Sequence, residues 1–141
     1  MNLLNKVRLL SKIRNIPSLK GEDSLTNKVA IALTGYSLDG KLKGVWFHVP
    51  NESVVSKDNK VTDILRIKRK HSMGLINGVP DLVFVSKDKT VFIELKTEKG
   101  RLSESQIYFK QWCIDEGIDY FVARSVEEVS EVLTKAKILV A

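Results

Sequence analysis

The feature that most restricts the fold of this chain is a pair of short apolar runs with a polar segment between them. Residues 82–85 (LVFV) and 91–95 (VFIEL) are rich in β-branched and aromatic residues, and the five residues between them are polar. This pattern predicts the two strands of a β-hairpin. Residues that face each other across a hairpin have a constant index sum, so a turn centred on the polar segment places Asp81 opposite Glu94.

The predicted register brings three charged side chains to one end of the hairpin. Opposed side chains on one face have Cβ atoms about 5 Å apart, close enough for the carboxylates of Asp81 and Glu94 to share a divalent cation. Lys96 follows Glu94 by two residues, so strand alternation puts it on the same face. Each residue also has an ordinary explanation, Asp81 as a turn residue and Glu94 with Lys96 as an exposed ion pair. Together they indicate a site, because Glu94 lies in an apolar run where an unpaired charge is unfavourable.

The remaining patterns predict helices before, between and after a few buried strands. The predicted helices cover residues 3–15, 22–36, 61–72 and 103–116 and a last segment that begins at Ser125, and further strands cover 45–49 and 120–123. Capping-box patterns begin the last two helices. Helices interleaved with buried strands define an α/β fold. We expect an N-terminal amphipathic helix, ended by Pro17, and a linker over residues 1–20, followed by one domain over residues 21–141.

Composition excludes several classes of protein. A chain of 141 residues has room for about one hydrophobic core. No run approaches the roughly 20 apolar residues of a membrane span, and the N-terminus lacks the apolar stretch of a signal peptide, so we expect a cytoplasmic protein without a membrane partner. With one cysteine, Cys113, and two histidines, neither an intramolecular disulfide nor a Cys/His zinc cluster can form. Any metal would be held mainly by oxygen.

Positive charge is concentrated in the first half of the chain. Residues 1–80 contain 14 basic and 6 acidic side chains, whereas residues 81–141 contain 9 and 11. This asymmetry favours a polyanion partner, although a basic surface that only maintains solubility is an equally good explanation. The densest basic cluster closes the helix predicted over residues 61–72 and consists of Arg66, Lys68, Arg69, Lys70 and His71. The helix dipole explains one or two of these cations but not the full set, which leaves the others available for contacts with the phosphates of a polyanion.

The charged residues of the hairpin stand in an order that resembles a known family. Gly78-Val79-Pro80-Asp81 followed by Glu94-Leu95-Lys96 is similar to the signature of the PD-(D/E)XK nucleases, and more narrowly to their VRR-NUC branch. Supporting stretches are His48-Val49-Pro50-Asn51-Glu52, Met73-Gly74, residues 97–106 and Ala123-Arg124-Ser125. The resemblance covers about residues 22–133 and leaves the helix at residues 3–15 outside.

The resemblance implies a restriction-endonuclease-like core, in which helices flank a small mixed central sheet, with an extra N-terminal helix. It also implies a deoxyribonuclease that depends on Mg²⁺ or Mn²⁺. The implied catalytic residues are Asp81, Glu94, Lys96 and Gln106, and the implied metal ligands are Asp81, Glu94, the backbone carbonyl of Leu95, and Glu22. Lys96 would orient or activate the attacking water. The position of Glu22 in the first turn of a helix is also explained by the helix dipole. His48, Asn51 and Glu52 match a family motif whose chemical role does not follow from the residues.

The expected partner is DNA, with branched or junction DNA as a candidate substrate. The resemblance to small stand-alone nucleases of phages and bacteria implies the cytoplasm of a bacterium or an infected host. Cutting of both strands by so small a chain favours a homodimer, for which the N-terminal helix is a candidate interface. One alternative is a non-catalytic DNA-binding or assembly module that keeps the nuclease fold. A basic structural protein without a nucleic-acid role is a third interpretation.

Overall fold

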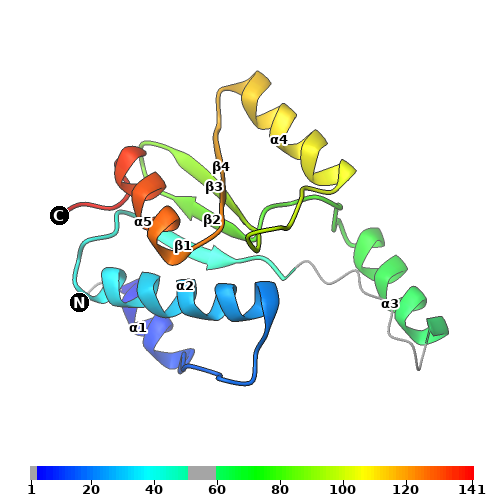
Figure 1. Cartoon of the computed structure of the whole chain (residues 1–141), viewed down its shortest axis with the longest axis horizontal. Helices are drawn as coiled ribbons and strands as arrows, with labels where there is room; N and C mark the ends of the chain where they lie inside the picture. Colours follow the sequence, from blue (N-terminus) through cyan, green and yellow to red (C-terminus); the bar gives the residue numbers. More distant parts are fainter. Residues whose placement is uncertain (1–2, 51–59) are drawn as a thin grey trace.

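A four-stranded sheet lies between helices in the computed structural model, which describes residues 3–50 and 60–141 (Figure 1). The elements in chain order are α1 (Leu3–Leu10), α2 (Gly21–Leu38), β1 (Val45–His48), α3 (Lys60–Ser72), β2 (Leu82–Val85), β3 (Thr90–Leu95), α4 (Glu104–Glu116), β4 (Asp119–Ala123) and α5 (Val126–Lys135). The strand order is β1-β2-β3-β4, with β1, β2 and β3 antiparallel and β4 parallel to β3. This mixed sheet with its helices confirms the predicted α/β fold.

The hairpin of β2 and β3 has the predicted register. Leu82 pairs with Ile93, and Val85 pairs with Thr90, so paired residues have the index sum expected from the sequence. Leu82 and Ile93 are fully buried, because alternate residues of each strand face the main core. One residue beyond these pairs, Asp81 and Glu94 stand opposite each other at the open end of the hairpin.

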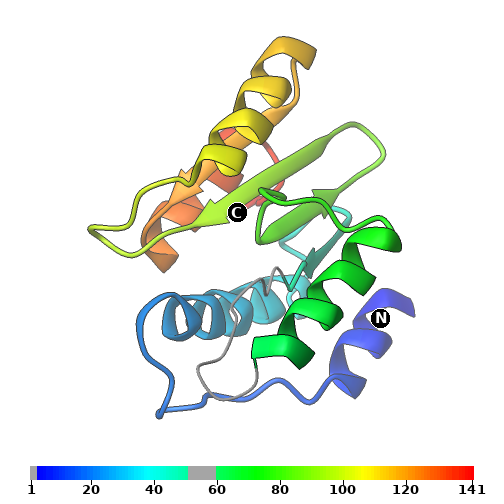
Figure 2. The ribbon, with the colours of Figure 1, turned by 90° about the vertical axis from the view of Figure 1, so that its right-hand side faces the viewer.

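Helices cover both faces of the sheet, as Figure 2 shows with α4 on one side and α2 on the other. The core on the first face combines buried residues of α2 and α5, such as Leu33 and Leu133, with the inward residues of β2 and β3. On the second face, the ring of Phe109 in α4 packs edge-on against Phe92 of β3, with ring centroids 5.3 Å apart. Glu94 follows Phe92 by two residues, so it lies on the face that α4 covers.

The helix predicted over residues 3–15 is shorter than expected, since α1 ends at Leu10. Two residues after this end, Lys12 has a left-handed φ of 51°, so the chain leaves the helical conformation before it reaches Pro17. The polar side of α1 contacts the rest of the protein: Asn5 donates to the carbonyl of Ser37, and Arg8 donates to the carbonyl of Trp46 in β1. The Arg8 guanidinium also lies over the Trp46 ring, 3.7 Å from its centroid. Leu3 and Leu10 are each 77% exposed, so the apolar side of α1 faces solvent.

The other helices and strands begin within two residues of the sequence predictions, and those with a predicted end also end within two residues of it. The polar sequence of residues 51–60 predicts a loop, and residues 51–59 lie outside the described residues. No helix in residues 3–50 or 60–141 combines the length and the apolar character needed to cross a bilayer.

Candidate active site

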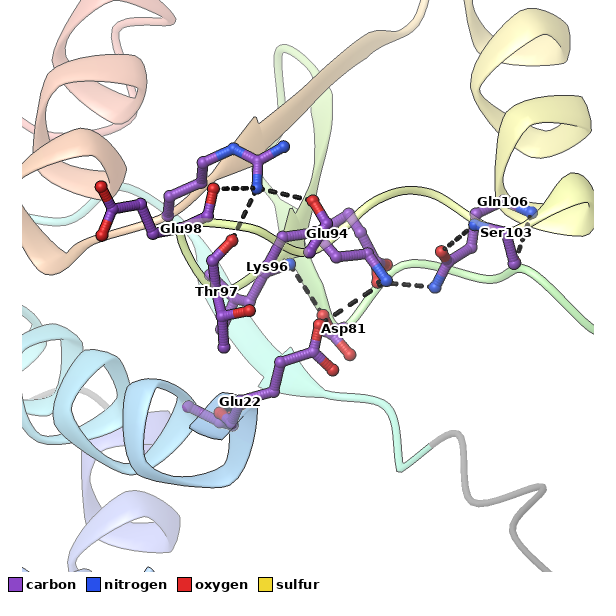
Figure 3. Close-up of polar contacts among 12 residues, drawn as sticks. Glu22, Asp81, Glu94, Lys96, Thr97, Glu98, Ser103 and Gln106 are labelled. Atoms are coloured by element: carbon purple, nitrogen blue, oxygen red, sulfur yellow. Dashed lines mark hydrogen bonds and ion pairs between the residues drawn. The ribbon is translucent and has the colours of Figure 1, made fainter. Parts of the chain in front are cut away.

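Asp81 lies at the open end of the hairpin and is held there by the backbone of the neighbouring strand. Its Oδ2 accepts a hydrogen bond from the Leu95 N–H at 2.7 Å. Leu95 is the last residue of β3, so this bond fixes the Asp81 carboxylate beside Glu94, as the predicted register requires (Figure 3).

Glu94 is the most buried charge of the site, with 2% of its surface exposed. Its Oε1 accepts a hydrogen bond from Gln106 Nε2 at 2.8 Å, whereas its buried Oε2 has no hydrogen-bond partner. Burial, and after it the negative charge of Asp81, raises the pKa of Glu94 to about 8, although the charge of Lys96 opposes this rise. The site therefore has a free acceptor atom and an excess of negative charge, both of which a cation would relieve.

Lys96 stands between two carboxylates. Its Nζ is 3.7 Å from Glu94 Oε1 and 3.6 Å from Glu22 Oε1, and only 8% of the residue is exposed. Glu22 comes from the first turn of α2 and is half exposed. It reaches the site through Lys96 (Figure 3), and its negative charge adds to the rise of the Glu94 pKa.

Gln106 both caps α4 and contacts Glu94. Its Oε1 accepts from the Ser103 N–H at 2.8 Å, and its own N–H donates to Ser103 Oγ, which completes the capping box of α4. Because the capping box engages Oε1, the Nε2 group is directed to Glu94. The start of α4 and the carboxylate on β3 are therefore joined by one side chain.

Gly78 allows the chain segment before Asp81 to press against the start of α4. Its φ is +88°, and a Cβ atom at this position would lie 2.3 Å from the backbone oxygen of Ser105. No side chain fits in that space or readily adopts that backbone angle. This contact brings the Gly-Val-Pro-Asp segment and the first turn of α4 together, so it positions Asp81 and Gln106 relative to each other.

His48 borders the site through the backbone of Asp81. Its Nδ1 is 3.0 Å from the Asp81 carbonyl oxygen, which also accepts from the Val49 N–H at 2.8 Å. A carbonyl only accepts, so Nδ1 of this exposed histidine carries the hydrogen. The two other residues of this motif, Asn51 and Glu52, lie outside the described residues.

Tyr120 is a neighbour of the site that sequence analysis missed. It pairs with Phe92 across β3 and β4, and its buried hydroxyl has no hydrogen-bond partner. Burial, and after it the negative charge of Glu94, raises the pKa of Tyr120. In the sequence this tyrosine is one aromatic residue in an apolar strand, and nothing there distinguishes it from a core residue.

The basic cluster of α3 is separate from these carboxylates, because α3 projects away from the sheet (Figure 1). At 3.6 residues per turn, Arg66, Arg69 and Lys70 share one side of the helix, and Lys68 lies on the opposite side. Arg66 also forms an ion pair with Asp63 at 3.4 Å. Nδ1 of His71 donates to the Leu75 carbonyl at 2.7 Å, which explains this histidine as a cap of the helix end.

The donor atoms at Asp81 and Glu94 are all oxygen and fit Mg²⁺ or Mn²⁺. Within residues 3–50 and 60–141, no three His, Cys, Asp or Glu side chains gather as a metal site. Mg²⁺ is commonly bound by one or two carboxylates, and water and substrate phosphate complete its octahedral shell. The buried, unpartnered Glu94 Oε2 is the observation that fits such an ion best.

A carboxylate pair and a lysine lie at the end of the mixed sheet of this α/β domain, and comparison with known proteins identifies the family of the domain. The family model of the VRR-NUC domain matches residues 35–127, so the chain belongs to the VRR-NUC family of the restriction-endonuclease-like superfamily. The matched range includes Asp81, Glu94, Lys96 and Gln106 but begins after Glu22.

A solved structure described as a VRR-NUC domain protein has the same fold. It superposes with a TM-score of 0.55 at 21% sequence identity, over 86% of this chain and 94% of that chain. None of the curated protein sequences matches this chain.

Proposed function

We propose that the protein is a metal-dependent nuclease that hydrolyses phosphodiester bonds of DNA. The convergence of Asp81, Glu94 and Lys96 at one end of the hairpin, within a VRR-NUC domain, carries this proposal. Hydrolysis of a phosphodiester requires a nucleophile near neutral pH and relief of the negative charge that builds up in the transition state.

Asp81 and Glu94 would hold the Mg²⁺ or Mn²⁺ ion, with the Leu95 carbonyl and Glu22 as further ligands. A bound divalent ion lowers the pKa of water and neutralises phosphate oxygens. Gln106 keeps Glu94 Oε1 fixed, so that the unpartnered Oε2 is the atom available for the ion. Glu22 contacts Lys96 instead of the two carboxylates, and its part in metal binding is the least direct of the four.

Lys96 would orient the attacking water and contact the scissile phosphate. Its ammonium group is a compact positive charge with three donors, which suits a tetrahedral phosphate and a water at the same time. The ion pairs with Glu94 and Glu22 direct Nζ toward the carboxylates. Arg66, Lys68, Arg69 and Lys70 of α3 would bind the phosphates on either side of the cut, which positions DNA without reading its sequence.

A cleavage panel tests the proposal. Linear duplex, single-stranded, flapped and four-way-junction DNAs are incubated with the full chain in Mg²⁺, in Mn²⁺ and with a chelator. We expect cutting with either ion, none with chelator, and the highest rate on a branched substrate. A protein that cuts none of these DNAs with either ion, yet binds DNA in a salt-dependent manner, would instead be a non-catalytic DNA-binding module.

A homodimer would place two sites on the two strands of one substrate. Two-fold pairing is the commonest closed arrangement of identical chains. Light scattering at micromolar concentration, with and without DNA, measures the assembly directly, and a monomer under both conditions would contradict the dimer.

A further inference from the structure

Arg124, the first residue after β4, binds the turn that follows Lys96. Its Nη1 lies 2.6 Å from the Thr97 carbonyl oxygen, 2.7 Å from that of Gly100 and 3.3 Å from that of Glu98. This nitrogen carries two hydrogens, so the two short contacts are full hydrogen bonds and the longest is shared. One side chain therefore holds both ends of the turn from Thr97 to Gly100.

This turn lies against the side chain of Lys96. The Gly100 N–H donates to the Thr97 carbonyl at 3.0 Å and closes the turn. A Cβ atom on Gly100 would lie 3.4 Å from Lys96 Cδ, so the backbone of the turn covers the stem of the lysine. The position of the turn consequently limits where Lys96 Nζ can be placed relative to Glu94.

The backbone at Arg124 is held in place by several hydrogen bonds. Its N–H donates to Glu128 Oε2 at 2.6 Å, and the Glu128 N–H donates to the cap residue Ser125 at 3.1 Å. The preceding Ala123 accepts from the Lys96 N–H at 3.0 Å. The junction of β4 and α5 is thus bonded both to the base of Lys96 and, through Arg124, to the turn beyond it.

We infer that Arg124 is a positioning residue, which holds the Thr97–Gly100 turn closed over Lys96 and thereby fixes the lysine for catalysis. This role rests on the proposed function, since it needs Lys96 to act on a phosphodiester. It predicts that loss of Arg124 lowers the turnover number and leaves the affinity for DNA unchanged. An arginine that bound DNA directly would have the opposite effect.

The test compares Arg124→Gln with Arg124→Lys in the full chain, on the best DNA substrate with Mg²⁺. Misplacement of a catalytic group by about 1 Å lowers a rate roughly 100-fold, so we expect Arg124→Gln to lower kcat about 10- to 100-fold. The dissociation constant for DNA should stay within about twofold, because no phosphate contact is removed. Arg124→Lys keeps the charge and part of the carbonyl bonding, so its kcat should lie between those of wild type and Arg124→Gln.

Lys99→Gln is the matched control. Lys99 is an exposed residue of the Thr97–Gly100 turn, and its substitution removes one positive charge, as Arg124→Gln does. Its kcat and affinity should equal those of wild type. Hydrogen exchange provides a second measurement that does not need cleavage. In Arg124→Gln the Gly100 amide should exchange faster, while thermal unfolding shows that the variant remains folded.

The outcomes separate this role from the proposed function. Wild-type cleavage that persists unchanged in Arg124→Gln, or a variant with weaker DNA binding and a normal kcat, overturns the positioning role alone. Unaltered exchange of the Gly100 amide also overturns it. A wild-type protein that cuts no DNA overturns the proposed function, and this role with it.

Discussion

The two charged regions of this molecule differ in how firmly their side chains are held. At the end of the hairpin, Glu94 and Lys96 are almost fully buried, and each is bonded to a neighbour. On α3, the side chain of Arg66 is 61% exposed, and Arg69 is also exposed. The first region is organised by burial and short contacts, and the second presents charge to solvent.

Because of this difference, we expect the hairpin residues to determine the rate of cleavage and the α3 residues to determine the affinity for DNA. Buried charges interact strongly with their few neighbours, so the loss of one disturbs the geometry of the others. Exposed charges act through a field that salt screens, and each contributes a small, nearly independent amount. Substitutions at the hairpin should therefore change kcat, and substitutions on α3 should change DNA affinity and its dependence on salt.

The largest effect should come from Lys96→Met, which keeps the apolar stem beneath the turn and removes the ammonium group. Positioned groups that assist proton transfer contribute about 100- to 10,000-fold to a rate, so we expect kcat to fall at least about 100-fold with unchanged DNA affinity. Lys99→Met is the matched control. A Lys96→Met protein that cuts at the wild-type rate would remove Lys96 from the mechanism.

The next effect concerns stability without metal. Folded Glu94 remains protonated up to about pH 8, whereas in the unfolded chain it ionises near its ordinary value of 4.5. Between these values the folded protein binds the extra proton, so the free energy of unfolding should fall as pH rises from about 4.5 to about 8. We expect a change on the order of a few kcal/mol.

Urea unfolding in chelator at pH 5 and pH 9 measures this change. Glu94→Gln should show a much smaller difference between the two conditions, because the group that titrates is absent. Added Mg²⁺ should stabilise the wild type most at the higher pH, since metal ligands must be deprotonated. Equal pH dependence in wild type and Glu94→Gln would contradict the assignment.

A smaller effect should follow from Gln106→Glu. A glutamate at this position keeps the capping box but replaces the donor to Glu94 with a like charge. We expect kcat of Gln106→Glu to fall about 30-fold. Gln106→Ala also loses the cap of α4, which is worth about 1 kcal/mol, so its melting temperature should lie further below that of wild type than the melting temperature of Gln106→Glu. Equal activity of Gln106→Glu and wild type would show that Gln106 only caps α4.

The smallest effect should appear on α3. The triple variant Arg66→Gln, Arg69→Gln, Lys70→Gln should bind DNA about 10-fold more weakly and reduce the slope of log affinity against log salt by about 3. At saturating DNA its kcat should equal that of wild type. Lys135→Gln, at the exposed end of α5, is the control and should change little. A loss of kcat in the triple variant would contradict the separation of the two regions.

Local patterns predicted most of the fold because the hairpin, the capping boxes and the apolar periodicities depend on residues close in the sequence. The index sum of the hairpin is an example, since Leu82 pairs with Ile93 as expected. The predicted length of α1 was wrong, and the reason is also local. The helix ends where Lys12 takes a left-handed conformation, and a lysine gives no signal for it in the sequence, unlike a glycine.

The approach of the Asp81, Glu94 and Lys96 side chains follows from strand alternation and register, and was predictable for that reason. The contacts of Gly78 with the start of α4 and of Arg124 with the turn were not. Both join segments more than 20 residues apart, and the loops that meet depend on how the whole sheet and its helices pack. Tyr120 was missed for the same reason.

The unusual orientation of α1 has a consequence for how the protein behaves in concentrated solution. β1 is the outermost strand on one side of the sheet, and strands in that position can recruit further strands from other molecules. Arg8 occupies the Trp46 carbonyl there and shields its indole ring. A chain shortened by its first ten residues loses this protection, and we expect it to polymerise through β1 and precipitate where the intact protein stays dissolved.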